Sequence, residues 1–74
     1  MKLKNGKIVI TLGDYLKLHG ISKNKLVLGA NIQRTQLQNY CLNKVARVDL
    51  GVLARICDYL DCRLEDIMIY ENNT

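Results

Sequence analysis

Polar side chains that could read the edges of nucleic-acid bases are concentrated in residues 33–43. If this segment is a helix with Leu37, Tyr40 and Cys41 facing inward, its outward side carries only amide, hydroxyl and guanidinium groups. Arginine can fork onto O6 and N7 of guanine, and glutamine or asparagine onto N6 and N7 of adenine. The outward positions are Gln33, Arg34, Thr35, Gln36, Gln38, Asn39 and Asn43. A solvated helix face is the alternative, but such faces usually carry Glu and Lys, so we favour base recognition.

Two groups of polar and basic residues flank this segment and could bind phosphate. The first group is Ser22, Lys23 and Asn24, at the start of the preceding predicted helix. Positive charge at a helix N-terminus is unfavourable for the helix dipole, so the lysine there is expected to contact something outside the helix. The free backbone amides of the first turn can bind a phosphate together with it. The second group is Asn43, Lys44 and Arg47, beyond the base-reading segment. Such contacts position a protein on DNA without specifying sequence, and ordinary surface cations are the alternative.

The charge of the chain is distributed unevenly along the sequence. The 74 residues carry a net charge of +4, with five basic and no acidic residues between positions 20 and 47. Positions 48–74 carry six acidic residues against two arginines. This asymmetry within one predicted domain, residues 1–74, indicates a basic face that meets a polyanion.

The sequence gives no indication of an enzyme. A chain of 74 residues leaves little room for a deep substrate pocket, and it contains no nucleophile elbow or phosphate-binding loop. Cys41, Cys57 and Cys62 form no C-x-x-C pair, and their spacing does not match a zinc site. The chain also lacks a secretory apolar segment and a run of the ~18 apolar residues that a membrane span needs. We therefore expect free thiols, a cytoplasmic location, and no cofactor, metal, membrane or small-molecule partner.

The elements that must position these residues are mostly short helices. A helix is expected to open at Thr11, with Asp14 completing a capping box, and to end at Gly20. Ser22 is the expected cap of a helix over 23–30, and Asn31, which tolerates positive φ, is expected to make the turn into 33–43.

The second half of the chain predicts two more helices. Asp49 is the expected cap of a helix ending near Asp61, whose apolar positions recur at spacings of three and four. These positions are Leu50, Leu53, Ile56, Cys57 and Leu60. A fifth, short helix is expected from Leu64, with Leu64, Ile67 and Met68 inward. Residues 7–10 and 69–71 are expected as two strands that pair the termini.

Segment 23–42, KNKLVLGANIQRTQLQNYCL, resembles the helix-turn-helix of the Cro/lambda-repressor-like, or XRE, family of transcriptional regulators. The apolar positions of that motif are occupied by Leu26, Ala30, Ile32, Leu37 and Tyr40. The stretch DLGVLARICDYLDCRLEDIM resembles the fourth and fifth helices of the family. The resemblance implies an all-α, five-helix lambda-repressor-like domain. Such a domain can also contain a minor two-stranded pairing of the termini. It also implies a set of base readers: Gln33, Arg34, Thr35, Gln38 and Asn39.

The expected function is a sequence-specific, double-stranded DNA-binding transcriptional regulator that reads the major groove with helix 33–43. A repressor is the expected kind of regulator, and a homodimer is the expected form, since one such helix reads only a few base pairs. The alternative is a protein-interaction module on the same fold, such as an antirepressor or an antitoxin-like partner. An apolar outward face on helix 33–43 would favour that alternative.

Overall fold

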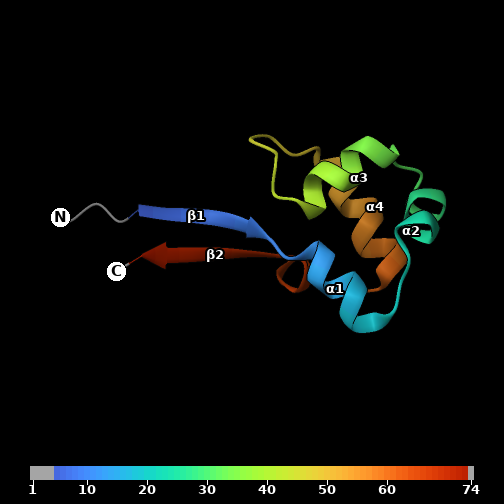
Figure 1. Ribbon diagram of the computed structural model, residues 1–74, viewed down its shortest axis with the longest axis horizontal. Helices are drawn as coiled ribbons and strands as arrows, with labels where there is room; N and C mark the ends of the chain where they lie inside the picture. Colours follow the sequence, from blue (N-terminus) through green and yellow to red (C-terminus); the bar gives the residue numbers. More distant parts are fainter. Residues whose placement is uncertain (1–4, 74) are drawn as a thin grey trace.

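The fold is a small group of helices with a two-stranded ribbon extending from one side (Figure 1). It is seen in a computed structural model that describes residues 5–73. Within this range the elements are β1 (Asn5–Ile10), α1 (Leu12–His19), α2 (Lys23–Ala30), α3 (Arg34–Cys41), α4 (Leu50–Leu60), a 3-10 turn η1 (Leu64–Asp66) and β2 (Met68–Asn73).

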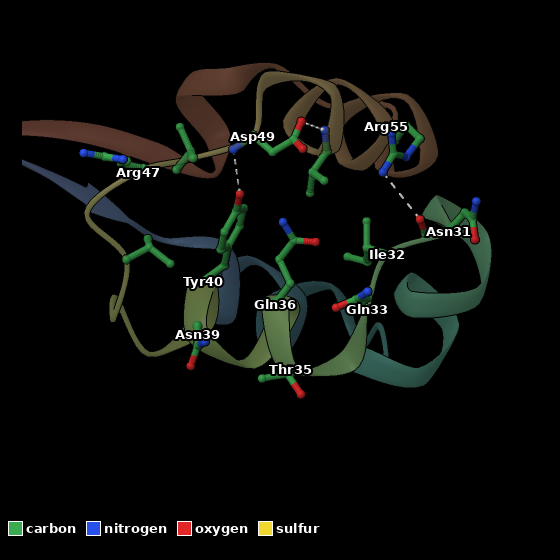
Figure 2. A pocket seen from close by; sticks show the side chains of 13 residues that line it. Asn31, Ile32, Gln33, Thr35, Gln36, Asn39, Tyr40, Arg47, Asp49 and Arg55 are labelled. Carbon is green, nitrogen blue, oxygen red and sulfur yellow. Dashed lines mark hydrogen bonds between the residues drawn. The ribbon is translucent and has the colours of Figure 1, made fainter.

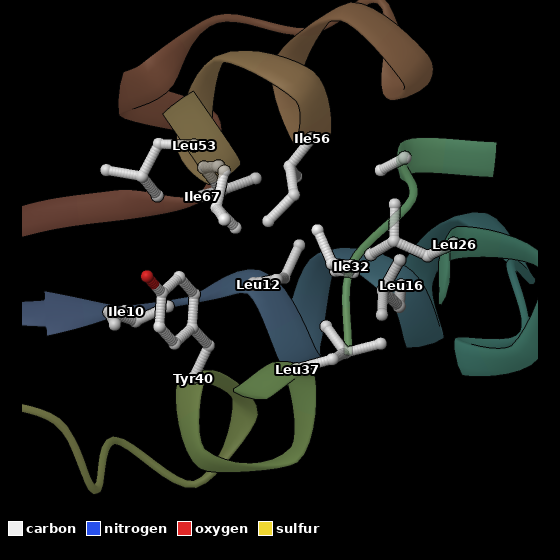
Figure 3. Packing of buried hydrophobic residues seen from close by; sticks show 12 residues of the cluster. Ile10, Leu12, Leu16, Leu26, Ile32, Leu37, Tyr40, Leu53, Ile56 and Ile67 are labelled. Carbon is white, nitrogen blue, oxygen red and sulfur yellow. The ribbon is translucent and has the colours of Figure 1, made fainter. Parts of the chain in front are cut away.

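All four helices direct apolar side chains into one core (Figure 3). The core residues are Ile10, Leu12, Leu16, Leu26, Ala30, Ile32, Leu37, Tyr40, Val52, Leu53, Ile56 and Ile67. Fully burying one leucine or isoleucine side chain stabilises a fold by about 1.5–3 kcal/mol, so these few residues supply most of the stabilisation available to so short a chain.

Several helix ends follow the local signals in the sequence. The Ser22 Oγ accepts a hydrogen bond from the Lys25 amide at 3.1 Å, and Asp49 Oδ1 accepts one from the Val52 amide at 3.2 Å. Gly20 ends α1 in the left-handed region with φ of 65°. These predicted caps are confirmed. The predicted capping box at Thr11 is wrong, because Thr11 makes no side-chain cap and its hydroxyl donates to the Asp66 carbonyl instead, at 3.3 Å.

The ribbon is formed by β1 and β2, which pair antiparallel with Ile8 opposite Tyr70 and Ile10 opposite Met68. At its base the Thr11 amide donates to the Ile67 carbonyl at 2.7 Å. The predicted pairing of residues 7–10 with 69–71 is therefore confirmed, and the strands are longer than expected.

The expected number of five helices is wrong. The described residues form four α-helices, and the segment after Arg63 makes only the single turn η1. It cannot continue as a helix because β2 begins at Met68 and pairs with β1. Two predicted core residues also lie outside the core: Leu50, at the first position of α4, is 78% exposed, and Leu64 is 48% exposed.

Candidate nucleic-acid interface

A tight turn joins α2 to α3. Asn31 ends α2 in the left-handed region, with φ of 53°, as predicted. The Ile32 amide donates to the Val27 carbonyl at 3.2 Å, and the Ile32 side chain is buried in the core. Gln33 is extended and precedes the first turn of α3, so α3 spans Arg34–Cys41 rather than the predicted 33–43. The turn and the buried Ile32 fix how the two helices are oriented.

One side of α3 is polar and faces solvent. Gln33, Arg34, Thr35 and Gln38 are exposed, and Asn39 is half-buried. Figure 2 shows the Thr35 and Asn39 side chains pointing away from α4. The outward placement expected for Gln36 is wrong: its side chain is half-buried and points toward α4, where it lines a groove.

Two side-chain hydrogen bonds connect this side of α3 to the start of α2. Arg34 Nη2 donates to Asn24 Oδ1 at 2.6 Å, and Lys23 Nζ donates to Gln38 Oε1 at 2.9 Å. Each bond joins one predicted base reader to one predicted phosphate ligand. The start of α2 and the exposed side of α3 thus form one continuous surface, which we call the α2–α3 surface: Ser22, Lys23, Asn24, Gln33, Arg34, Thr35, Gln38 and Asn39.

The loop after α3 adds basic residues and is held by the core. Lys44 and Arg47 are both exposed in this loop, and Arg47 lines the groove between α3 and α4. The amide of Asp49 donates to the buried Tyr40 hydroxyl at 3.0 Å, which anchors the loop to α3 (Figure 2). No acidic residue occurs between positions 20 and 48, and the nearest carboxylate to these basic residues in the sequence is Asp49, two positions after Arg47.

Asn43 is not part of this surface, because its side-chain amide is bound to the ribbon. Asn43 Oδ1 accepts from the Ile10 amide at 2.6 Å, and Asn43 Nδ2 donates to the Ile10 carbonyl at 2.9 Å. These two bonds occupy one donor and one acceptor of the carboxamide. The geometry favours a structural role for Asn43, and the phosphate contact expected from the sequence stays a prediction.

Arg55 is a structural residue that the sequence analysis did not single out. Its Nε donates to the Ala30 carbonyl at 2.9 Å and its Nη2 to the Asn31 carbonyl at 3.4 Å. The guanidinium therefore satisfies carbonyls at the C-terminus of α2, where the helix dipole favours positive charge. An arginine within the apolar sequence of α4 is the only signal that could have indicated this role.

Cys41, Cys57 and Cys62 are free thiols, and burial affects the ionisation of Cys41 and Cys62. Burial raises the pKa of the Cys41 thiol, although Lys23 nearby opposes the shift. Burial and the neighbouring Cys57 thiol raise the pKa of Cys62 to about 11. At neutral pH both groups are protonated, the form that neither attacks as a nucleophile nor ligates a metal.

The described part of the chain contains no cluster of three or more His, Cys, Asp or Glu side chains arranged to hold a metal ion. None of the helices between residues 5 and 73 has the length and apolar character needed to cross a membrane.

Comparison with known proteins agrees with this geometry. A family model described as the Cro/C1-type HTH DNA-binding domain matches residues 11–73, from the residue before α1 to the end of β2. Comparisons with curated proteins and with solved structures gave no match. Since the family model covers most of the 74 residues, the chain belongs to the Cro/C1-type helix-turn-helix family and is a regulator that binds double-stranded DNA.

Proposed function

We propose that the protein is a sequence-specific transcriptional repressor, with residues 1–74 acting as one DNA-binding domain and α3 lying in the major groove. One observation supports this proposal: the exposed side of α3 is polar and free of carboxylates, and Thr35 and Asn39 on it point away from α4. A helix in the major groove must present donors and acceptors to base edges without repelling phosphate.

Five residues are proposed to read bases: Gln33, Arg34, Thr35, Gln38 and Asn39. Arg34 is at the first turn of α3, which lies deepest in the groove when a recognition helix docks. Its guanidinium fits O6 and N7 of a guanine, and each such bidentate pair is worth about 1–3 kcal/mol of discrimination. Gln38 and Asn39 can pair with adenine in the same way, while the Thr35 hydroxyl and methyl suit several bases.

Five other residues are proposed to bind phosphate: Ser22, Lys23, Asn24, Lys44 and Arg47. The first three begin α2, whose N-terminal amides attract anions, and the acid-free first turn of that helix leaves the site positive. Lys44 and Arg47 lie beyond the other end of α3. Phosphate contacts at both ends of α3 would hold the helix along the groove.

A homodimer is proposed because a single recognition helix contacts only a few base pairs. Two copies on half-sites about one helical turn apart give useful affinity and specificity. Repression is the proposed direction of regulation, because a dimer bound over a promoter would exclude the polymerase. The alternative function, a protein-interaction module, needs an apolar outward face on α3, and the exposed positions of α3 are polar instead.

The test is enrichment of bound duplexes from a random-sequence library, followed by affinity measurements at several salt concentrations. We expect a palindromic consensus and an affinity that falls steeply with salt, because each neutralised phosphate releases counterions. Steep salt dependence without any consensus would contradict sequence-specific binding. No binding to any duplex at low salt would contradict the proposal altogether.

A further inference from the structure

A hollow separate from the α2–α3 surface lies between the ribbon and the loop that joins α3 to α4. Its volume is about 580 Å³, within the range of sites that hold small molecules. Figure 1 shows this loop extending on the side of the helices from which the ribbon projects. We call this hollow the ribbon pocket. Its apolar walls include Ile8 and Ile10 of β1, Val45, Ala46 and Val48 of the loop, and Met68 of β2.

The apolar side chains of the ribbon pocket are incompletely covered. Ile8 is 59% exposed and Val48 is 38% exposed, while Val45 and Met68 are half-buried. Removing apolar surface from water is favourable in proportion to the area removed. A ligand with an apolar chain that lies along these walls would therefore be bound by the hydrophobic effect.

The loop that forms one wall is hydrogen-bonded only near its two ends. Asn43 bonds the amide and the carbonyl of Ile10, and the Asp49 amide donates to the Tyr40 hydroxyl. In the described part of the chain, residues 45–48 make no hydrogen bond with any other residue. A segment with few hydrogen bonds rearranges at low cost, so this wall can adjust to a ligand while both ends stay in place.

The ribbon pocket has a positive charge at its β1 side. Of the described residues that line it, Lys7 is the only charged one. Glu71 lies opposite Lys7 in the ribbon but does not line the pocket. A lysine side chain can lay its apolar stem along a wall and keep its ammonium group at the opening. The charge of the pocket therefore favours an anionic ligand over a cationic one.

A main-chain donor lies beside this charge. The Ile10 amide points away from β2, because it donates to Asn43 Oδ1. Main-chain groups of an antiparallel strand alternate in direction, so the Ile8 amide points to the same outer edge. Ile8 lines the pocket and follows Lys7 directly. An amide and an ammonium side by side are suited to a carboxylate, which accepts hydrogen bonds from both.

The edge of β1 does not suit a peptide in this pocket. An extended peptide that adds to a strand binds through a row of main-chain hydrogen bonds. Asn43 already occupies both the amide and the carbonyl of Ile10, so such a row would stop beside the pocket. A flexible alkyl chain needs no main-chain partners. The geometry therefore favours a small amphiphile.

We propose that the ribbon pocket binds an unbranched carboxylate of medium chain length. The alkyl chain lies against the apolar walls, and the carboxylate accepts hydrogen bonds from the Ile8 amide and the Lys7 ammonium group. This site goes beyond the proposed function and does not depend on it.

The bound carboxylate is proposed to act as an effector, a step that rests on the proposed function. Val45 and Val48 line both the ribbon pocket and the groove between α3 and α4, so a ligand contacts the loop that carries Lys44 and Arg47. These two residues are proposed to bind phosphate. A negative charge added beside their loop opposes that contact, so the ligand lowers the affinity for DNA.

The first test is isothermal titration calorimetry of the full chain with decanoate, below its micelle concentration and without DNA. We expect one molecule to bind per chain with a dissociation constant on the order of 0.1 mM. Decylamine, which has the same chain length but a positive charge, should bind about tenfold more weakly. Absence of saturable decanoate binding, or equal affinities for the two compounds, would overturn the proposal.

Three variants test the carboxylate contact. Lys7→Gln should weaken decanoate binding about tenfold. Lys17→Gln makes the same change of charge at an exposed lysine of α1 outside the pocket, and it should leave binding unchanged. Glu71→Gln removes the carboxylate opposite Lys7 and should tighten binding. Equal effects of Lys7→Gln and Lys17→Gln would contradict the contact.

Nuclear Overhauser effects from the decanoate chain locate the site without any variant. We expect contacts with the methyl groups of Val45, Val48 and Met68. Leu18 and Leu28 are the internal control, because they are 82% and 74% exposed elsewhere on the surface. Contacts with these two leucines in place of the pocket residues would show adsorption to exposed apolar surface and would overturn the site.

The effector step is tested by measuring affinity for the selected duplex with the pocket saturated. Decanoate should lower that affinity about fivefold for the unmodified chain and have little effect on Lys7→Gln. An unchanged affinity would overturn the effector step. Decanoate binding is measured without DNA, so failure of the site and failure of the proposed function are distinguishable.

Discussion

The guanidinium of Arg34, at the start of α3, donates a hydrogen bond to the side-chain oxygen of Asn24, at the start of α2, over 2.6 Å. This bond crosses the helix-turn-helix and links two residues with different proposed tasks. Arginine presents five N–H donors, so Nη2 can be held by Asn24 while other donors remain for a guanine. We therefore propose that Asn24 positions Arg34 for base reading in addition to its proposed phosphate contact.

Asn24→Ala should weaken binding to the preferred DNA site in a way that depends on Arg34. A double-mutant cycle of Asn24→Ala and Arg34→Ala should give a coupling free energy of about 0.5–3 kcal/mol, as expected for residues in contact. Lys25→Ala, the exposed neighbour on the same turn of α2, is the control and should show no coupling. Purely additive effects of Asn24 and Arg34 would mean that the bond does not position the guanidinium when DNA is bound.

Lys44→Ala should weaken binding to all duplexes alike. Loss of one phosphate contact should lower the slope of log affinity against log salt by about one unit and leave the preferred sequence unchanged. Lys23→Ala should lower the slope similarly but also change sequence preference, because Lys23 donates to the proposed base reader Gln38. The measurement is fluorescence anisotropy on the selected duplex and on a scrambled one. If Lys44→Ala leaves the salt slope as it was, Lys44 does not contact phosphate.

Asn43→Gly should destabilise the fold without changing how salt affects DNA binding. Glycine adopts the left-handed φ of 59° found at Asn43, so the variant removes the two bonds to Ile10 without adding backbone strain. We expect a loss of about 1–2 kcal/mol in the free energy of unfolding, measured by urea denaturation. An unchanged unfolding free energy combined with a shallower salt slope would instead assign Asn43 to phosphate.

Arg55→Ala should lower the free energy of unfolding by about 1–3 kcal/mol, because two carbonyls at the end of α2 lose their donor. Arg55→Lys should recover only part of this loss, since an ammonium cannot reproduce the fork of the guanidinium. Urea denaturation followed by circular dichroism checks both. An Arg55→Ala variant as stable as the unmodified chain would show that water replaces these bonds at no cost.

The parts of the fold that sequence reasoning predicted correctly depend on local chemistry. Ser22 and Asp49 cap the helices that follow them, and Asn31 makes the turn, because each bond joins residues only a few positions apart. The polar side of α3 could also be predicted from the sequence, because Leu37 and Tyr40 mark the buried side by helical periodicity.

The parts that could not be predicted depend on contacts between residues far apart in sequence. Thr11 looked like a helix cap, but its hydroxyl and amide are used by residues more than 50 positions later. The side-chain amide of Asn43 binds Ile10, 33 positions earlier, and no local signal indicated this contact. Gln36 looked exposed because only the folded chain brings α4 beside it. No periodicity or spacing in the sequence reports such partners.

The most direct test of base reading by α3 compares the unmodified protein with Arg34→Ala on the selected site and on every single-base-pair variant of it. We predict that the unmodified protein prefers guanine at one position of each half-site by about 1–3 kcal/mol. Arg34→Ala should lose that preference, keep the preferences at the other positions and retain the helical circular dichroism of the folded chain. Identical preferences at every position for the two proteins would contradict the placement of α3 in the major groove.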